Sequence, residues 1–378
     1  MRPGAQQIDT PKGVSGGRVR GRLLVIAAAT LAAPLVMHGC LPGESGVGSQ
    51  QGEPIAGATV LGQLGEAPGQ FAYPRALEQD GSHLWVVDKS ARVQELDPVT
   101  GECIAWFRMP EFELGKPVGI TCGPGPDGGR LLYIPDTHYH RVMVYRPPAR
   151  PAATNSAAAT LRPVEPELVA SFGSYGDGPG QFIYPTDIAI LPTADGSRME
   201  RLYVTEYGGN DRVSVYDRDF NFLFSFGSFG IAEEEAPDAI VFQRPQCIEI
   251  DPAAGEVYVV DSRNHRIGRF TLDGHLKGWI GGPHHSGRAL GEFRYPYAMA
   301  LLGDGTALVA EFGNNRVQRV DLATGEGLRV WGRAGRARGE LATPWAITVM
   351  GQRTFVLDSG NNRIVAFPTP PPARKRGA

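Results

Sequence analysis

One pattern, repeated six times, constrains the fold of this chain more than any other feature. Each copy contains a lead proline, an alternating strand, a second strand ending in an acid, a short turn, an arginine and a third strand. The second strands are Leu84 to Asp88, Leu132 to Asp136, Leu202 to Glu206, Val257 to Asp261, Ala307 to Glu311 and Thr354 to Asp358. With 50 Gly and 31 Pro in 378 residues, long helices are disfavoured, and the pattern predicts short strands joined by turns.

Repeats of this kind are typical of propeller blades, because radial closure leaves few exposed sheet edges. A Gly-rich phrase and an aromatic strand accompany several copies, so each holds about four strands. The sequence predicts an all-β, six-bladed propeller of four-stranded blades over residues 58–367. The lead prolines are Pro74, Pro117, Pro185, Pro245, Pro296 and Pro344.

The phrases around these prolines resemble the NHL repeat family. The first part of the repeat motif resembles GQFAYP at Gly69 to Pro74 and GQFIYP at Gly180 to Pro185. The part around the acid-to-arginine turn resembles YVVDSRNHRI at Tyr258 to Ile267 and VLDSGNNRIVAF at Val356 to Phe367. This resemblance implies the same six-bladed fold for most of the chain.

The sixth copy stops after its third strand and is followed by a Pro-rich segment, which cannot continue a sheet interior. The missing outer strand must come from elsewhere. Residues 58–64 precede the first copy and are apolar enough to supply it. We therefore predict that this N-terminal strand closes the ring and that residues 368–378 form a disordered Pro-rich and basic tail.

An acid followed about five residues later by an arginine recurs in every copy. Six identical pairs do not suit a function that needs one site, so we interpret them as structural: the carboxylate caps the turn and holds the arginine. The pairs are Asp88 with Arg92, Asp136 with Arg141, Glu206 with Arg212, Asp261 with Arg266, Glu311 with Arg316 and Asp358 with Arg363.

Positions that differ between copies on one shared face indicate a binding site. Two residues after the lead proline, five copies have a small residue and the third has Asp187. The first strand of a blade lines the channel, so we expect this carboxylate to contact a ligand or to pair with a neighbouring arginine. The residues one position after the lead prolines and the turns after the second strands lie at the same end of the ring as Asp187. They add nine candidate ligand-binding residues: Arg75, Gln246, Tyr297, Trp345, His138, His140, Tyr207, His265 and Phe312.

Some NHL-like propellers, the peptidyl-hydroxyglycine amidating lyases, hold zinc at the channel with histidines. No predicted first or second strand here contains a histidine, and histidines on separate loops are poorly suited to fixing tetrahedral geometry. A metal-dependent lyase or hydrolase is therefore the alternative. The favoured interpretation is a binding or scaffolding module without catalytic residues, metal ligands or cofactors, which recognises a small molecule, peptide or protein.

The N-terminus predicts export. Five basic residues precede an uncharged run from Leu23 to Met37, which is short for a transmembrane helix. The run ends in Met37–His38–Gly39–Cys40, which resembles the lipobox of bacterial lipoproteins, with Cys40 as the lipidated residue. An ordinary signal peptide or an uncleaved anchor are the alternatives. We predict a lipoprotein signal peptide at 1–40, a flexible tether at 41–57, and a membrane-anchored protein in the periplasm or at the cell surface.

The charge balance excludes a general nucleic-acid binder. The whole chain has 37 Lys and Arg against 40 Asp and Glu. Removal of residues 1–40 takes away five basic residues and one acid, which leaves 32 against 39 and a net charge of −7. A mildly acidic surface has no broad positive field to attract phosphate backbones. The predicted partners are the membrane, through the lipid, and an unidentified ligand.

Overall fold

The computed structural model describes residues 52–148, 161–282 and 286–371. The predicted leader with Cys40, most of the predicted tether, and residues 372–378 lie outside these ranges. Within them, no helix is both long and apolar enough to cross a membrane.

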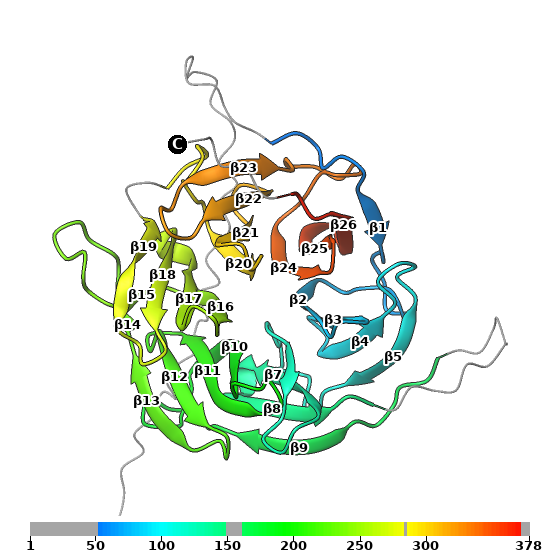
Figure 1. The fold of residues 1–378 in the computed structure, drawn as a ribbon. Helices are drawn as coiled ribbons and strands as arrows, with labels where there is room; N and C mark the ends of the chain where they lie inside the picture. The colour runs from blue at the N-terminus through cyan, green and yellow to red at the C-terminus, as the bar shows by residue number, and fades with distance from the viewer. Residues whose placement is uncertain (1–51, 149–160, 283–285, 372–378) are drawn as a thin grey trace, which may run out of the picture. The chain divides into compact units, whose positions relative to one another are not determined.

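Six antiparallel four-stranded sheets stand in a ring, which confirms the predicted fold class (Figure 1). The first strand of each sheet lies nearest the central axis and the fourth lies at the periphery. Blade 1 contains β2 (Pro74–Gln79), β3 (Leu84–Asp88), β4 (Arg92–Leu96) and β5 (Cys103–Arg108); blade 2 contains β6 (Thr121–Pro124), β7 (Arg130–Asp136), β8 (Arg141–Arg146) and β9 (Glu167–Phe172); blade 3 contains β10 (Tyr184–Pro192), β11 (Met199–Tyr207), β12 (Arg212–Asp217) and β13 (Phe222–Phe226).

The second half of the ring has the same order. Blade 4 contains β16 (Pro245–Asp251), β17 (Glu256–Asp261), β18 (Arg266–Thr271) and β19 (Leu276–Gly281); blade 5 contains β20 (Pro296–Leu301), β21 (Thr306–Glu311), β22 (Arg316–Asp321) and β23 (Gly327–Trp331); blade 6 contains β24 (Pro344–Met350), β25 (Arg353–Asp358), β26 (Arg363–Pro368) and β1 (Thr59–Leu61). Short 3₁₀ turns come after three second strands: η1 (Thr137–Tyr139), η2 (Ser262–Asn264) and η4 (Ser359–Asn361).

The ring closes as predicted. Strand β1 pairs antiparallel with β26, with Val60 opposite Val365, and so becomes the outer strand of blade 6. The residues just before β1 are also held, which corrects the prediction of a flexible tether up to residue 57. Ile55 is 3% exposed, its N–H donates to the Gly339 carbonyl at 2.9 Å, and the Gly332 N–H donates to the Glu53 carbonyl at 2.8 Å.

The start of the predicted disordered tail is likewise attached to the ring. The Thr369 N–H donates to the Gln352 carbonyl at 2.7 Å. The buried Arg319 donates to the carbonyls of Pro370 and Pro371 at 2.9 and 2.6 Å. The disordered segment predicted from residue 368 therefore cannot begin before residue 372.

A further departure is a two-stranded parallel sheet between blades 3 and 4. Strands β14 (Ser228–Phe229) and β15 (Val241–Phe242) flank the acidic segment 231–240. Four isolated bridges have the same parallel geometry in other blades, including Leu64 with Phe71 and Ala334 with Leu341. The two-stranded sheet is thus the extended form of a loop that recurs around the ring.

The acid–arginine pairs fasten this loop to the blade. Their closest N–O contacts, in chain order, are 2.8, 2.9, 2.8, 3.0, 2.5 and 2.7 Å. In blade 6, the Asp358 carboxylate also accepts the Ala342 N–H at 2.6 Å, and Arg363 donates to the Ala337 and Glu340 carbonyls at 2.9 Å. The buried carboxylate and its partly buried arginine satisfy backbone groups that would otherwise lack partners, which is a structural role.

Candidate functional site

The central channel encloses a cavity of about 250 Å³, lined mainly by the first strands of the blades. Five of the predicted residues line it: Arg75, Asp187, Gln246, Tyr297 and Trp345. In every blade except the second, a β-bulge comes directly after the lead proline, so one residue is extra relative to the partner strand. Bulges of this kind re-aim a side chain. This explains how Arg75, Gln246, Tyr297 and Trp345, all of which occupy the bulge position, reach the mouth of the channel.

Aromatic rings surround this mouth, and we call them the collar. The Tyr297 ring stacks on Phe312 at 4.5 Å between centroids and meets the Trp345 ring edge-on at 5.0 Å. The Tyr73 ring lies 5.9 Å from Trp345. On the other side, the Tyr184 ring lies 5.2 Å from Tyr207 and 5.6 Å from His138. The collar is therefore built from all blades except the fourth, which contributes Arg244 and Gln246.

Two guanidinium groups lie against the collar. The Arg75 guanidinium carbon is 4.9 Å from the Trp345 ring centroid, and that of Arg244 is 5.1 Å from the Tyr207 centroid. In the described part of the chain, neither group forms a salt bridge, and the Nε atoms of both are buried without a hydrogen-bond partner. Burial lowers the pKa of Arg75, but a guanidinium remains charged at neutral pH.

Three of these mouth residues, Tyr73, Tyr184 and Arg244, were not predicted from the sequence. Tyr73 and Arg244 stand directly before the lead proline of their blades, and both have a positive φ, 54° and 60°. Their backbone N–H groups are held by the preceding blade: Tyr73 N donates to Asn362 Oδ1 at 2.7 Å, and Arg244 N donates to Asp211 Oδ2 at 2.6 Å. This contact fixes the left-handed backbone that presents each side chain at the mouth.

Contacts with the backbone of the next blade also explain two predicted site histidines that do not line the cavity. His265 Nδ1 accepts the Tyr295 N–H at 3.0 Å, and His140 Nδ1 donates to the Ile183 carbonyl. Both histidines occupy the left-handed position after the 3₁₀ turn and connect one blade to the next. The structure therefore gives His140 and His265 an inter-blade role, whereas the His138 ring faces Tyr184 of the collar.

Below the mouth, the channel becomes acidic. Asp187 lines the cavity, and its Oδ2 accepts the Ile248 N–H at 3.0 Å; no arginine pairs with it among the described residues. Two further carboxylates, Glu78 and Glu249, line the cavity four residues after their lead prolines. These two carboxylates were not among the site residues predicted from the sequence. The other four blades have Thr or Ala at that position.

Burial raises the pKa of all three channel carboxyls. The pKa of Asp187 rises to about 7 and that of Glu78 to about 8, and the pKa of Glu249 lies well above its usual value. Mutual repulsion adds to the effect of burial, since the charges of Glu78 and Asp187 both raise the pKa of Glu249. Ionisation of these carboxyls is therefore disfavoured in the channel, and a cation that enters it would favour their charged forms.

This acidity predicts a pH-dependent stability. The pKa of Glu78 is higher in the folded protein than in the unfolded chain, so between about pH 4 and 8 the unfolded chain releases the Glu78 proton more readily. The free energy of unfolding therefore falls as the pH rises through this range. Glu78→Gln is expected to raise the melting temperature at pH 8.5 by several degrees, and to change it little at pH 4. Thermal melts across this range test the prediction, with Glu102→Gln on an exposed turn as the control. A difference between Glu78→Gln and the parent that does not vary with pH would contradict it.

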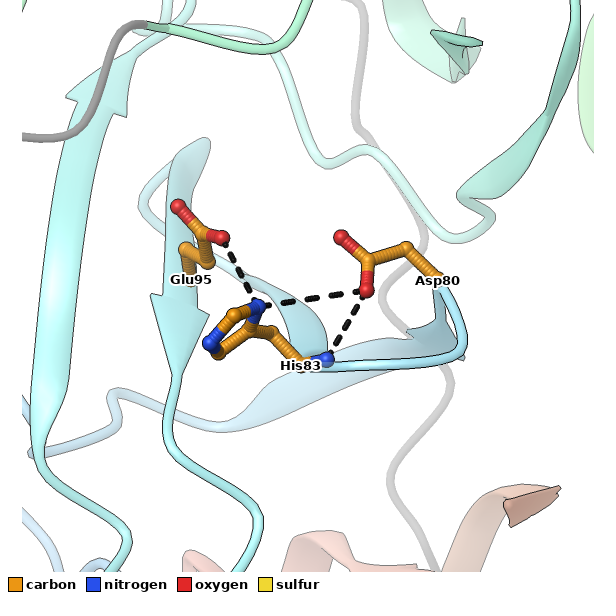
Figure 2. A group of neighbouring side chains, drawn as sticks. All are labelled: Asp80, His83 and Glu95. Carbon is orange, nitrogen blue, oxygen red and sulfur yellow. Dashed lines mark hydrogen bonds and ion pairs between the residues drawn. The ribbon is translucent and has the colours of Figure 1, made fainter. Parts of the chain in front are cut away.

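A second cluster lies at the other end of blade 1. Asp80 and His83 lie in the turn between β2 and β3, and Glu95 belongs to β4 (Figure 2). His83 Nδ1 is 3.4 Å from Glu95 Oε1 and 4.0 Å from Asp80 Oδ1. These three groups have the chemistry to hold a divalent metal ion. Asp80, however, already accepts the N–H groups of Ser82 and His83 and the Trp85 indole, so its carboxylate also has a local role in the turn.

Comparison with known proteins agrees with this architecture. The NHL repeat family model matches residues 242–270, which span the end of the loop before blade 4 through its third strand. No curated protein sequence matches the chain. The chain is a six-bladed β-propeller in which residues 242–270 match the NHL repeat.

Three solved structures with the same fold share at most 17% sequence identity with this chain. A structural-genomics protein of unknown function from Bacteroides thetaiotaomicron matches with a TM-score of 0.57 and 14% identity, over 82% of this chain and 72% of that one. A chain of a nidogen/laminin complex gives 0.50 and 17%, over 76% and 89%. A streptogramin B lyase gives 0.50 and 13%, over 83% and 98%. At these identities the likeness concerns the fold alone.

Proposed function

We propose that the protein is an exported, lipid-anchored binding module whose ligand enters the mouth of the central channel. The observation that carries this proposal is the pair of guanidinium groups held against aromatic rings without a carboxylate partner in the described part of the chain. Such groups are costly to bury unpaired, at about 1–3 kcal/mol for each orphaned donor, unless a ligand completes them. A small cavity with aromatic walls and a few convergent polar groups is the usual form of a ligand site.

A thermal-shift screen tests the binding function. The full chain is mixed with a defined set of amino acids, organic acids, phosphate esters, sugars and short peptides. We expect at least one compound to raise the melting temperature of the parent but not that of Trp345→Ala, because Trp345 supplies both a channel wall and the support of Arg75. Shifts that persist in Trp345→Ala, or a complete set without any shift, would contradict a site at the mouth.

The lipid anchor forms the second part of the proposal and rests on the sequence from Leu23 to Cys40. Cys40→Ser is expected to abolish incorporation of labelled lipid, because the serine hydroxyl cannot form the thioether, and to release the protein from membranes or leave it unprocessed. Lipid labelling and membrane fractionation in a bacterial host check this. If the variant still incorporates lipid, or stays in the membrane fraction in processed form, the lipobox assignment is wrong.

A metal-dependent lyase or hydrolase is the second candidate, and the observation that favours it is the cluster of Asp80, His83 and Glu95. The cluster lies at the end of β2 opposite to Arg75, so it does not face the collar. The geometry therefore supports binding at the mouth more strongly than metal-dependent catalysis.

A further inference from the structure

Three unpartnered donors lie at the mouth beside His138 Nδ1, which is also without a partner among the described residues and whose role depends on its tautomer. The ligand class that the three donors indicate rests on the proposed binding function. Arg75 Nε, Arg244 Nε and Gln246 Nε2 are buried and have no hydrogen-bond partner in the described part of the chain. Gln246 is only 6% exposed and lines the cavity. Each of these atoms is a donor, so a ligand that completes them must offer acceptor oxygens.

The charge at the mouth indicates that these oxygens belong to an anion. The positive charge of Arg244 is close enough to lower the pKa of Arg75 further, after the effect of burial. Asp211 accepts the Arg244 N–H and is the carboxylate whose charge acts on Arg244, but neither guanidinium forms a salt bridge among the described residues. Two such guanidinium groups near one another match a carboxylate or a similar oxyanion. Their stacking against Trp345 and Tyr207 fixes their positions before a ligand arrives.

The channel below has the opposite character. Glu78, Asp187 and Glu249 line it, and no lysine or arginine forms a salt bridge with any of them among the described residues. The charged groups that influence Glu78 are Arg130, Asp80 and Asp187, of which only Arg130 is positive. A cationic group in the channel would allow the three carboxyls to ionise and would be stabilised by them.

The distance between the two regions limits the size of the ligand. Arg75 and Glu78 lie three residues apart on β2, and a strand rises about 3.3 Å per residue, so the two positions are separated by roughly 10 Å. Asp187 is closer to the mouth, since it comes two residues after its lead proline rather than four. A chain of several methylene groups with a hydrogen bond at each end spans this interval.

We propose that the ligand is a small zwitterion. Its oxyanion, such as a carboxylate, binds Arg75, Arg244 and Gln246 at the mouth. Its cationic end, such as a primary ammonium, enters the channel toward Asp187, Glu78 and Glu249. The orphaned donors and the unpaired carboxyls are independent observations, and a single ligand with both charges satisfies both.

Calorimetric titration of the full chain with three probes tests this proposal at neutral pH and low salt. The probes are 6-aminohexanoate, hexanoate, which lacks the ammonium group, and hexylamine, which lacks the carboxylate. We expect 6-aminohexanoate to bind about tenfold more tightly than either of the others, because only it contacts both regions.

Variants of the protein test which residues bind the carboxylate of the probe and which bind its ammonium group. Arg75→Gln is expected to weaken 6-aminohexanoate and hexanoate about tenfold and to leave hexylamine unchanged, whereas Arg75→Lys retains part of the affinity. Glu249→Gln is expected to weaken 6-aminohexanoate and hexylamine but not hexanoate. Arg146→Gln, on an exposed ion pair with Glu167, is the matched control and leaves all three affinities unchanged.

Each contrary result has a definite meaning. If 6-aminohexanoate binds no more tightly than hexanoate, the channel has no subsite for a cation. If 6-aminohexanoate binds no more tightly than hexylamine, the mouth has no subsite for an oxyanion. If none of the three probes binds at millimolar concentration, the zwitterion proposal is overturned. If, in addition, a neutral compound raises the melting temperature of the parent but not that of Trp345→Ala, the binding function is supported and only the zwitterion proposal is wrong.

Discussion

A chain that begins at Gly65 is expected to lose its cooperative thermal transition. It lacks β1, so β26 becomes an exposed edge, and it also lacks Ile55, which is buried against the ring. Because each blade depends on its neighbours, opening the ring at one blade affects all of them. Circular dichroism melts and analytical gel filtration measure the effect, with aggregation as the expected result.

A chain that begins at Gly52 is the matched control. It retains Ile55 and β1, and it is expected to melt as the parent does. If the chain starting at Gly65 melts with the same midpoint and the same steepness as this control, the closing strand does not stabilise the ring.

Replacement of Arg316 by methionine is expected to destabilise the protein by about 3–5 kcal/mol, because removal of one partner leaves a buried charge uncompensated. Arg316 is 2% exposed, its Nε lies 2.5 Å from Glu311 Oε1, and Glu311 is fully buried. Arg316 also donates to the carbonyls of Ala289 and Glu292, which would lose a partner. A fall of about 10 °C in melting temperature is the expected reading.

Two variants separate this effect from a general effect of losing an arginine. Arg333→Met removes a half-exposed arginine paired with Glu340, and its cost is expected to stay below about 1 kcal/mol. The double change Glu311→Leu with Arg316→Met removes both charges and is expected to recover part of the loss. A melting temperature of Arg316→Met close to that of the parent would show that the pair does not anchor the loop.

The fold could be predicted because the same physical requirements recur in every blade. The lead proline, the acid and the arginine recur in every copy, and the acid pairs with the arginine in all six blades, so the repeat itself indicates the strand order. The docking of residues 52–57 could not be predicted in this way, because it occurs once. Ile55 alone in a Gly- and Glu-rich segment gives no periodic signal, although its side chain is buried.

The site was only partly predictable. Arg75, Gln246, Tyr297 and Trp345 stand at one position of the repeat, so a comparison of the six copies finds them. The same comparison extended to the fourth residue after the proline would have found Glu78 and Glu249. Tyr73 and Arg244 depend on a left-handed backbone stabilised by the preceding blade, which no pattern within one copy indicates.

Two histidines were predicted as site residues but have a structural role. His140 and His265 stand in turns at the same end of the ring as the collar, and their chemistry is typical of binding sites. Their ring nitrogens, however, contact the backbone of the next blade. His265 accepts the N–H of the residue before the next lead proline, as Asn315 and Asn362 do at the equivalent positions of blades 5 and 6, and His140 contacts the Ile183 carbonyl. A role shared with asparagine at equivalent positions is structural, and only the three-dimensional contacts reveal it.

The central claim is that a ligand binds at the mouth of the channel. Diffraction from crystals grown with the compound that gives the largest thermal shift tests it most directly. The predicted result is ligand density between the Arg75 and Arg244 guanidinium groups, extending toward Asp187. Ligand density elsewhere on the protein, with the channel mouth occupied by water alone, would contradict the claim.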